Sequence, residues 1–281
     1  MSTDAEVPQT PLEAASPFEL RVGLGKDVPE TTVRQALASG EMGFVHSFTT
    51  GSAVDGPGVR VVAWMAGCMW RCVYCHNPDT WSMRNGIPVS IATATEELAK
   101  YRNGLKVMKG GLTISGGEPL MQHKFVTRLF AAAKGMGVHT ALDTIGYYGD
   151  LLSDDDLASI DLVLLDLKTW DPAQHVKYVG MEIGPTLAFA RRVAALRVPI
   201  WVRHVVVPGW TDDEATPRGI AEFAASLGNV ERVDVLPFHQ MGRYKWSNLH
   251  MTYRLENVEP PSADTVQRSI DAFTAAGLRA Y

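Results

Sequence analysis

The three cysteines of this 281-residue chain are the residues whose type and spacing point most directly to chemistry. Cys68, Cys72 and Cys75 form a C-x3-C-x2-C pattern, and the chain has no other cysteine. Three thiols so close together make a poor disulfide framework, whereas thiolates are ligands of iron–sulfur clusters and of zinc. A four-iron cluster held by three cysteines leaves one iron open to a small ligand. The spacing therefore predicts a metal or cluster site.

Two other interpretations of the cysteines stay open at this point. The thiols could be small buried apolar groups, because free cysteine packs well in protein cores. Alternatively, His76 could complete a zinc site with three cysteines and one histidine. The adjacent Cys75 and His76 would reach one ion only with strain, which disfavours the zinc interpretation.

Strand-length apolar runs alternate with helix-length segments from Phe44 onward. Runs rich in Val, Leu and Ile and bounded by Gly, Pro or Asp suit buried parallel strands. Repeated alternation predicts right-handed crossovers and a parallel sheet, either open or closed into a partial barrel. The predicted strands are 59–65, 112–115, 138–143, 162–166, 200–207 and 233–237. The predicted helices are about 93–107, 121–136, 153–160, 185–196, 212–227 and 262–276.

Three of these helices carry start signals. Thr93 with Glu96 has the form of a capping box. Ser153 and Thr211 each precede a run of acidic residues, which are favourable at the positive end of a helix.

Polar residues gather at the C-terminal ends of the predicted strands, where ligands of α/β folds bind. We therefore expect the polar residues there to face one cavity. Burying the carboxylates of Asp143 and Asp166 at such positions costs free energy unless they are paired or bound to a cation. They could form salt bridges with Lys168 or Arg203, or they could line a charged cofactor. His239, at the end of the last predicted strand, could likewise be structural or functional. The strand-end groups are the cysteine loop, 115–118, Asp143-Thr144, 166–168, Pro208-Gly209 and His239.

Composition excludes several classes of protein. The chain has 46% hydrophobic and 20% charged residues, which is ordinary for a globular protein. Its net charge of −5 gives no basic field for nucleic acid. No apolar run reaches the roughly 18 residues of a membrane span, and the acidic, proline-rich start does not look like a secretory signal. We therefore expect a cytoplasmic protein that binds neither nucleic acid nor membrane.

The sequence divides into two parts. Residues 1–40 are expected to form a partly disordered N-terminal extension, broken by prolines, with a possible short helix at 31–38. Residues 41–281 are expected to form one catalytic domain.

The cysteine pattern resembles the signature of the radical S-adenosylmethionine (SAM) superfamily, in which SAM chelates the open iron. Tyr74 fits the aromatic residue that commonly precedes the third cysteine. The glycines and Glu118 after the second predicted strand resemble the superfamily's GGE motif. That resemblance makes Gly117 and Glu118 candidate SAM contacts.

From about residue 43 onward the chain resembles the family of pyruvate formate-lyase activating enzymes. The order and spacing of the shared stretches agree throughout. They are His46-Ser47-Phe48, 54–60 (VDGPGVR), 75–81 (CHNPDTW), 113–118 (TISGGE), Leu142-Asp143-Thr144, 165–168 (LDLK), 205–210 (VVVPGW), and 236–239 (LPFH) with Lys245-Trp246.

This resemblance implies a (β/α)6 partial barrel of the TIM type and a [4Fe–4S] cluster on Cys68, Cys72 and Cys75. The implied SAM contacts are Tyr74, His76, Gly117, Asp166, Leu167, Lys168 and His239. A monovalent cation is implied on Asp143, Thr144, Asp166 and the Leu164 carbonyl. Asp55 and Arg60 are implied near a groove for the protein substrate.

The implied activity is a radical reaction without a side-chain acid or base. The reduced cluster cleaves SAM, and the resulting 5′-deoxyadenosyl radical takes a hydrogen atom from a glycine of pyruvate formate-lyase. A flavodoxin or a ferredoxin is the implied electron donor. An activase of another glycyl-radical enzyme, a small-molecule radical SAM enzyme, and a non-catalytic cluster or zinc protein remain alternatives. Activases with extra clusters need further cysteines, which this chain lacks.

Two positions depart from the family pattern. Ile145 stands where the family often has Asn, which could alter a hydrogen bond next to the cofactor site. Pro119 follows the GGE motif, where Ala is common in some members.

Overall fold

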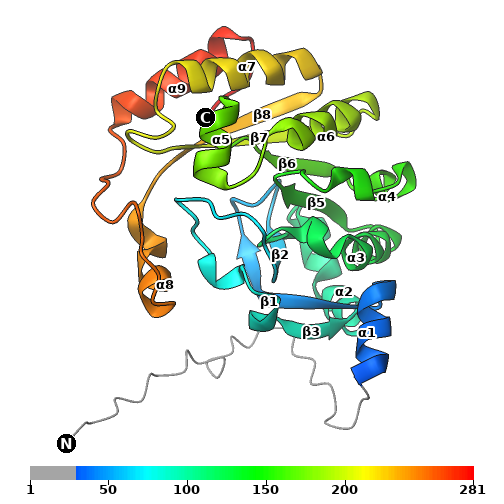
Figure 1. Cartoon of the computed structure of the whole chain (residues 1–281). Coiled ribbons are helices and arrows are strands. Elements are labelled where there is room, and N and C mark those ends of the chain that lie inside the picture. Colours follow the sequence, from blue (N-terminus) through cyan, green and yellow to red (C-terminus); the bar gives the residue numbers. More distant parts are fainter. Residues whose placement is uncertain (1–29) are drawn as a thin grey trace, which may run out of the picture.

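The structure is a computed structural model, and it describes residues 30–281 (Figure 1). Helix α1 (Glu30–Ser39) confirms the short helix predicted at 31–38. The predicted partial disorder falls mainly on residues 1–29, which lie outside the described residues. Within the described residues, no helix has the length and apolar character to cross a membrane.

Six parallel strands form the centre of the sheet, and all six predicted runs are confirmed. The first four runs are short, apolar and almost fully buried, as expected of strands covered on both faces, whereas the last two alternate buried residues with partly or fully exposed ones. The strands are β2 (Arg60–Met65), β4 (Gly111–Gly116), β5 (His139–Thr144), β6 (Leu162–Asp166), β7 (Ile200–Val206) and β8 (Val230–Pro237).

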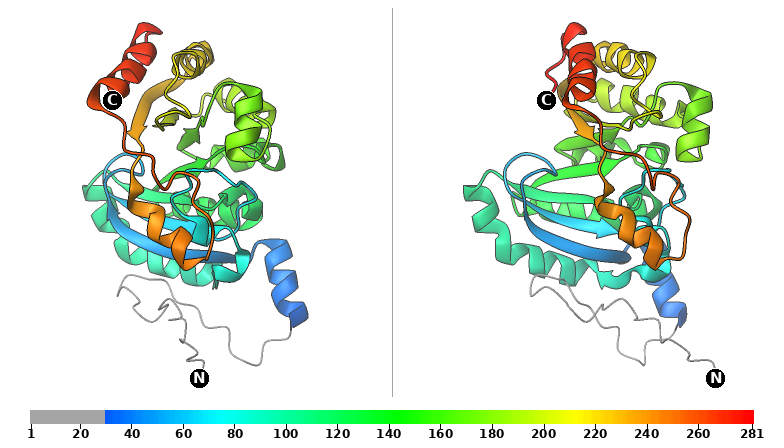
Figure 2. Two further views of the ribbon diagram at one scale, coloured as in Figure 1. Left: turned by 60° about the vertical axis from the view of Figure 1, so that its left-hand side comes forward. Right: turned by 90° about the vertical axis from the view of Figure 1, so that its left-hand side faces the viewer.

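Two further strands extend the sheet beyond β2. Strand β1 (Met42–Ser52) pairs antiparallel with β2, and β3 (Ile87–Ser90) pairs antiparallel with β1. The strand order is β3-β1-β2-β4-β5-β6-β7-β8, so β3 and β8 are the two edges. The parallel part therefore has the form of a partial (β/α)6 barrel, and Figure 2 shows it from two further sides.

Helices cover the outer side of this sheet, and the six predicted ones are confirmed with small shifts of their ends. They are α2 (Ile91–Val107), α3 (His123–Gly135), α4 (Asp154–Ala158), α6 (Gly184–Ala195), α7 (Ala215–Leu227) and α9 (Ala263–Ala275). Two short helices near the strand ends were not predicted, α5 (Pro172–Val179) and α8 (Arg243–Asn248). Short 3-10 turns are η1 (Pro78–Thr80), η2 (Met83–Asn85), η3 (Pro119–Gln122), η4 (Gly149–Leu151) and η5 (Gln240–Gly242).

Two of the three predicted helix starts are confirmed. Ser153 forms a capping box with Asp156 at the start of α4. The prediction for Thr93 is wrong, because α2 begins one residue after Ser90, whose hydroxyl accepts the Thr93 amide. The acidic start after Thr211 is confirmed, because the Asp213 carboxylate accepts the amides of Ala215 and Thr216 at the start of α7.

Two large apolar clusters and a small one formed by Ala141, Leu162 and Leu164 hold the fold together. The larger one fills the space between the sheet and the outer helices, with Ile114, Phe125 and Phe130 completely or almost completely buried. A second cluster lies around the cysteine loop. It comprises Cys68, Trp70, Cys72, Val73, Tyr74, Ile145, Tyr178, Val179, Val207, Phe238, Trp246, Tyr253 and Leu255. Burial at about 25 cal/mol per Å2 of apolar surface stabilises this loop as part of the fold.

Candidate functional site

The cysteine loop joins β2 to η1, and it closes on itself through backbone hydrogen bonds. The Gly67 amide donates to the Thr80 carbonyl at 2.7 Å, and the Cys68 amide donates to the Trp81 carbonyl at 3.1 Å. Cys68 and Cys72 are buried and Cys75 is half-buried, and all three are free thiols. The loop thus places the three thiols at the C-terminal edge of the parallel strands.

Helix α5 fixes the middle of this loop. The Arg71 amide donates to the Val179 carbonyl and the Val73 amide to the Tyr178 carbonyl, each at 2.9 Å. These two bonds flank Cys72 on both sides. Because α5 was not predicted from the sequence, the contact that holds Cys72 was not predicted either.

Burial makes single thiolates in this loop unfavourable. It raises the pKa of Cys72 to about 12, although Lys168 opposes the shift, and it also raises the pKa values of Cys68 and Cys75. The negative charge of a neighbouring cysteine in its thiolate form adds to the rise in the pKa values of Cys68 and Cys72. Metal ligation requires the deprotonated form, so a positively charged group bound to all three sulfurs would relieve this cost.

The donor set fits a cluster with three cysteine ligands. The thiols belong to one loop, they interact electrostatically, and the chain has no fourth thiol. In the part that the structure describes, no group of three or more His, Cys, Asp or Glu side chains is arranged so that it could hold a metal ion.

The turn after β4 packs directly against the cysteine loop. A Cβ at Gly117 would lie 2.3 Å from the Gly67 carbonyl oxygen and 3.2 Å from the Cys68 Cβ. The preceding Gly116 has φ of 113°, which side chains rarely adopt. Only glycines therefore allow this turn to approach Cys68 so closely.

Glu118 ties this turn to the end of β5. Its carboxylate accepts hydrogen bonds from the Leu120 amide at 3.0 Å, the Thr144 hydroxyl at 2.6 Å and the Ile145 amide at 3.2 Å. Burial raises its pKa to about 7. Three protein donors thus occupy the carboxylate, while its contact with SAM stays a prediction. The Ile145 bond uses the backbone, so the departure from Asn leaves it intact.

Asp143 and Asp166 both form the salt bridges that the sequence left open. Arg203 Nη1 lies 3.1 Å from Asp143 Oδ2, and Lys168 Nζ lies 2.7 Å from Asp166 Oδ2. Burial raises the pKa of Asp143, against the effect of Arg203. Burial also acts on Asp166, but Lys168 and Arg203 outweigh it and lower the Asp166 pKa. The second oxygen of Asp143, Oδ1, is buried without a hydrogen-bond partner.

Asp55 lies close to this charged group. Its Oδ1 is 4.0 Å from Arg203 Nη1, and Ser52 Oγ donates to its Oδ2 at 2.5 Å. Its place in a substrate groove stays a prediction.

Arg60 has no exposed surface. Its guanidinium donates to Thr113 Oγ1 at 2.9 Å and to the Leu112 carbonyl at 2.6 Å, so it braces the inside of the barrel. This placement does not present Arg60 to a groove on the surface.

The remaining predicted SAM contacts surround the same strand ends. Tyr74 is buried, its hydroxyl has no hydrogen-bond partner, and Lys168 Nζ lies 5.9 Å from its ring centre. The rings of His76 and His239 meet edge to face with centres 4.2 Å apart. The Leu167 amide donates to the Arg203 carbonyl at 3.0 Å. The fold therefore brings the cysteines, these residues and the two aspartates to one edge of the sheet.

The structure adds residues to which the sequence assigned no role. Arg71 Nη1 donates to the Cys68 and Trp70 carbonyls at 2.8 and 2.7 Å. Trp246 Nε1 donates to the Cys75 carbonyl at 3.0 Å. Lys245 and Trp246 belong to a stretch that this chain shares with the resembled family, and that shared stretch was the sequence feature that could have marked them as functional residues.

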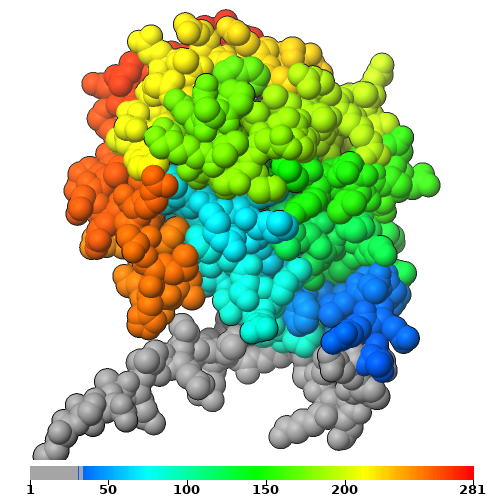
Figure 3. All heavy atoms as spheres, viewed as in Figure 1, coloured from blue at the N-terminus to red at the C-terminus, as the bar shows by residue number. Residues whose placement is uncertain are grey.

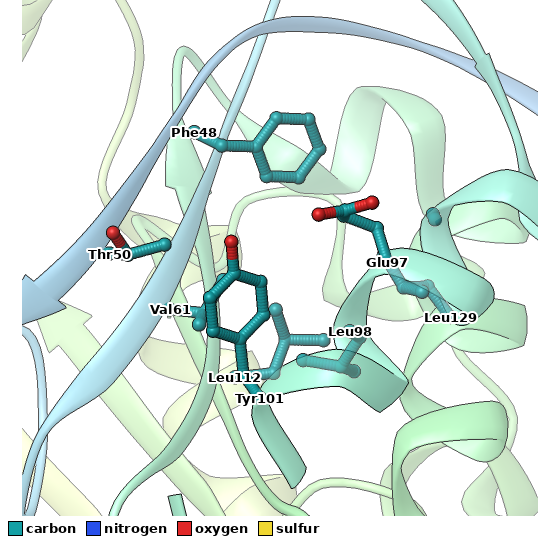
Figure 4. Close-up of a pocket in the computed structure, with 9 residues that line it drawn as sticks. Phe48, Thr50, Val61, Glu97, Leu98, Tyr101, Leu112 and Leu129 are labelled. Atoms are coloured by element: carbon teal, nitrogen blue, oxygen red, sulfur yellow. The ribbon is translucent and has the colours of Figure 1, made fainter. Parts of the chain in front are cut away.

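A separate pocket lies between β1 and α2 (Figure 4). Phe48, Thr50, Leu98 and Tyr101 are among its lining residues. None of the predicted cluster, SAM, cation or groove residues lines it, so it is distinct from the strand-end site.

Comparisons with known proteins agree with this site. The 4Fe-4S single cluster domain family matches residues 54–171, which include the cysteine loop and the turn after β4. The pyruvate formate-lyase 1-activating enzyme of Escherichia coli (strain K12) is 41% identical over 229 residues, 81% of this chain and 93% of that protein. The pyruvate formate-lyase-activating enzyme of Staphylococcus epidermidis is 41% identical over 234 residues, with the same two shares.

Solved structures agree on the fold. A domain of the pyruvate-formate lyase-activating enzyme from Bacteroides vulgatus covers 61% of this chain and 98% of its own, at 27% identity and a TM-score of 0.50. A radical SAM methyltransferase from Sphaerobacter thermophilus covers 91% of this chain and 81% of its own, at 16% identity and a TM-score of 0.58. The similarity to the methyltransferase supports the predicted partial-barrel fold and says nothing about the reaction.

These findings favour the iron–sulfur interpretation of the cysteines over the zinc and buried-thiol interpretations. The predicted family is confirmed by the identity of the chain to relatives that it covers almost completely. The chain belongs to the family of pyruvate formate-lyase-activating enzymes, within the radical SAM enzymes.

Proposed function

We propose that this protein is the radical SAM activase that generates the glycyl radical of pyruvate formate-lyase. One observation carries the proposal: three free thiols share one loop, and Gly117 packs directly against that loop at the C-terminal edge of the parallel strands. The relatives named for this activity match nearly their whole length. That match favours pyruvate formate-lyase over another glycyl-radical enzyme as the target.

Cys68, Cys72 and Cys75 would hold a [4Fe–4S] cluster, with SAM on the open iron. When bound and reduced, this pair supplies one electron to the sulfonium, giving methionine and a 5′-deoxyadenosyl radical that takes a hydrogen atom from the target glycine. The chain's own residues position these groups and exclude water.

Lys168 and Tyr74 suit the cofactor side of this site. Lys168 is paired with Asp166 at 2.7 Å, and its positive charge partly opposes the rise that burial causes in the pKa of Cys72. The unpartnered hydroxyl of Tyr74 is a buried polar atom that would gain a partner from a bound ligand. No side chain here needs to act as an acid or a base.

A monovalent cation near the SAM carboxylate is a separate part of the proposal. The orphaned Asp143 Oδ1 supports it, because a buried carboxylate oxygen without a donor is a suitable ligand for a small cation. Thr144, Asp166 and the Leu164 carbonyl would complete the cation's protein ligands.

An acidic one-electron carrier, a flavodoxin or a ferredoxin, is the proposed electron donor. Three exposed cations beside the cysteine loop support it: Arg71 over the Trp81 ring, Lys177 over Tyr178 and Arg254 over Trp210, each within 5.5 Å of the ring centre. Contact between the Tyr178 and Trp210 rings links the last two. This local positive charge, in a chain of net charge −5, would attract an acidic partner. The cytoplasmic location predicted from the sequence is part of the same proposal.

The first test is release of 5′-deoxyadenosine by anaerobically reconstituted protein given SAM and a strong reductant. We expect product from the wild type and none from Cys72→Ala, because two cysteines do not hold the cluster. Product formation that does not depend on Cys72 would contradict the assignment of the cysteines.

A second arm separates this function from small-molecule radical SAM chemistry. Addition of pyruvate formate-lyase should increase the release of 5′-deoxyadenosine and give a protein radical signal in electron paramagnetic resonance (EPR). Turnover that responds to a metabolite and not to the protein would favour the small-molecule alternative.

A further inference from the structure

The segment after β8 returns to the cysteine loop and lies against it. Helix α8 packs against η1, which follows the cysteine loop, and Figures 1, 2 and 3 show the orange C-terminal segment next to the cyan segment that contains this loop. Residues 240–246, which include η5 and the start of α8, contact the loop at Cys75, His76, Asn77 and Asp79. The contacts are of three kinds, and all converge on one short stretch.

Trp246 makes the first contact, with the third cysteine itself. Its indole Nε1 donates to the Cys75 carbonyl at 3.0 Å, and the side chain is almost fully buried. Two rings hold it in place. Trp81 meets it edge to face with ring centres 5.2 Å apart, and the tilted ring of Tyr253 lies 5.0 Å away. Packing therefore fixes the donor before it meets the carbonyl.

Lys245 makes the second contact, with the residues that follow Cys75. Its ammonium lies 2.8 Å from Asn77 Oδ1 and 3.1 and 3.0 Å from the two oxygens of Asp79. Asp79 also faces His46 Nε2 of β1 at 3.4 Å. This link joins the segment after β8, the cysteine loop and β1.

Gly242 makes the third contact. A Cβ on this residue would lie 2.7 Å from His76 Cδ2 and 2.8 Å from the His76 carbonyl oxygen. The backbone of η5 is therefore pressed against the residue that follows Cys75.

Cys75 is the cysteine that most needs such support. Cys68 and Cys72 are buried, whereas Cys75 is only half-buried. Cys72 is flanked by the two backbone bonds to α5, and Cys68 is held by its hydrogen bond to the Trp81 carbonyl and by the Gly117 turn. The stretch from Cys75 to Asp79 is instead held by polar contacts with Lys245 and Trp246, which lie 166–171 residues away in the sequence.

We propose that residues 240–246 act as a clamp that positions Cys75, with Lys245 and Trp246 as positioning residues that set the stability and reduction potential of the cluster. This inference rests on the proposed function, because it requires the cysteines to carry a cluster. Groups around a metal ligand orient it, and donors and positive charge near an iron–sulfur cluster favour its reduced form. Loss of either anchor should loosen the third ligand and lower the reduction potential.

The test compares two clamp variants with two matched controls in anaerobically reconstituted holoprotein. Trp246→Phe keeps an aromatic ring and removes the N–H, and Lys245→Met keeps the aliphatic stem. Trp201→Phe is the control for the first, since Trp201 Nε1 donates to Glu231 outside the site at 3.3 Å. Lys134→Met is the control for the second, since Lys134 pairs with Asp161 at 2.7 Å on the outer side of the sheet.

Two readouts other than turnover report on the clamp. One is the rate at which a strong iron chelator removes the cluster, and the other is the midpoint potential from an EPR-monitored titration. We expect iron loss about tenfold faster in both clamp variants. The midpoint potential should also shift to more negative values in these variants, while both controls stay close to the wild type. Urea unfolding of each variant checks the fold, and if Trp246→Phe does not fold, Lys245→Met decides the question.

The failures of the clamp and of the proposed function are distinguishable. Equal rates of iron loss and equal potentials in clamp and control variants, with a stable wild-type cluster, would overturn the clamp alone. A wild-type protein that assembles no cysteine-dependent cluster would overturn the clamp and the proposed function together.

Discussion

Arg203 pairs with Asp143 across the inside of the partial barrel, with Nη1 3.1 Å from Oδ2. Arg203 is on β7 and Asp143 on β5, and β6 between them brings Asp166 within 3.8 Å of the same guanidinium. Asp55 approaches it at 4.0 Å from the loop after β1. One largely buried cation thus lies close to three carboxylates, of which Asp166 also pairs with Lys168, at the base of the proposed cofactor site.

Replacing Arg203 should therefore destabilise the fold strongly. Arg203→Met leaves the three carboxylates without this partner, and breaking a buried ion pair in this way costs about 3–5 kcal/mol. Urea unfolding at pH 8 measures the loss. The control is Arg218→Met, because Arg218 is exposed on α7. Equal unfolding free energies for the two variants would contradict the role given to Arg203.

Buried His175 should make the stability sensitive to acid. Burial lowers its pKa, and its Nδ1 lies 2.6 Å from the Met181 carbonyl oxygen, with Lys168 adding positive charge nearby. The unfolded chain then takes up a proton at a higher pH than the folded protein does. The contribution of a neutral His175 is complete above the unfolded pKa of about 6.5 and is lost as pH falls below it.

The variant His175→Gln isolates this effect. Between pH 7.5 and 5.5 the wild type should lose more unfolding free energy than the variant, by up to about 1.4 kcal/mol per pH unit below 6.5. The other titrating groups act on both proteins and cancel in the difference. Parallel pH profiles for the two proteins would show that His175 does not titrate as described.

The contact between Gly117 and the cysteine loop should be intolerant of a methyl group. Gly117→Ala places a Cβ 2.3 Å from the Gly67 carbonyl oxygen, so the loop must move and the thiols must move with it. We expect iron content after reconstitution to fall to less than half that of the wild type, measured by iron analysis and absorbance.

Gly135 provides the matched control for this substitution. It lies in α3, and nothing lies within 4 Å of its Cβ position. Gly135→Ala should retain a full cluster and gain up to about 1 kcal/mol of stability from the helix preference for alanine. If Gly117→Ala binds as much iron as Gly135→Ala, the close approach is not important for the cluster.

The cations beside the cysteine loop should speed the reduction of the cluster by a protein donor and leave its reduction by a small reductant unchanged. Lys177→Glu and Arg254→Glu reverse charges that lie on the Tyr178 and Trp210 rings. We expect the double variant to be reduced by an acidic flavodoxin about tenfold more slowly at low salt, with the difference shrinking at high salt. Lys106→Glu, on exposed α2, is the control.

Reduction by dithionite provides the second comparison, and it should proceed at the same rate in all these proteins. A double variant that accepts electrons from the flavodoxin as fast as Lys106→Glu would place the donor elsewhere on the surface.

The parallel strands were predictable because their apolar runs are short, continuous and bounded by turn residues. Strand β1 was not, since its 11 residues mix Ser, Thr and Gly with apolar residues, and only four of them are buried. Helix α8 has only six residues, too few for a periodic pattern. Strand β1 and helices α5 and α8, all absent from the prediction, contact the cysteine loop or the turn that follows it, so these errors fall on the supports of the site.

In the candidate site, too, the residues marked by local sequence patterns were predictable and the contacts between distant residues were not. The C-x3-C-x2-C spacing and the strand-end positions identify the cysteines, Gly117 and Asp143 because these signals are local. The contact of Lys245 with Asp79 joins residues 166 positions apart, and it exists only after the sheet has brought β8 back toward β1. No local spacing records such a contact. The hydrogen bonds from Thr144 and Ile145 to Glu118 were hidden for the same reason, since they join residues 26 and 27 positions apart.

The most direct test of the central claim follows one atom. Pyruvate formate-lyase labelled with α-deuterated glycine is incubated anaerobically with reconstituted protein, SAM and reductant, and the 5′-deoxyadenosine is analysed by mass spectrometry. The account predicts one deuterium in the product, in step with the appearance of the glycyl radical signal and absent with Cys72→Ala. Unlabelled 5′-deoxyadenosine in the presence of a fully loaded cluster would contradict it.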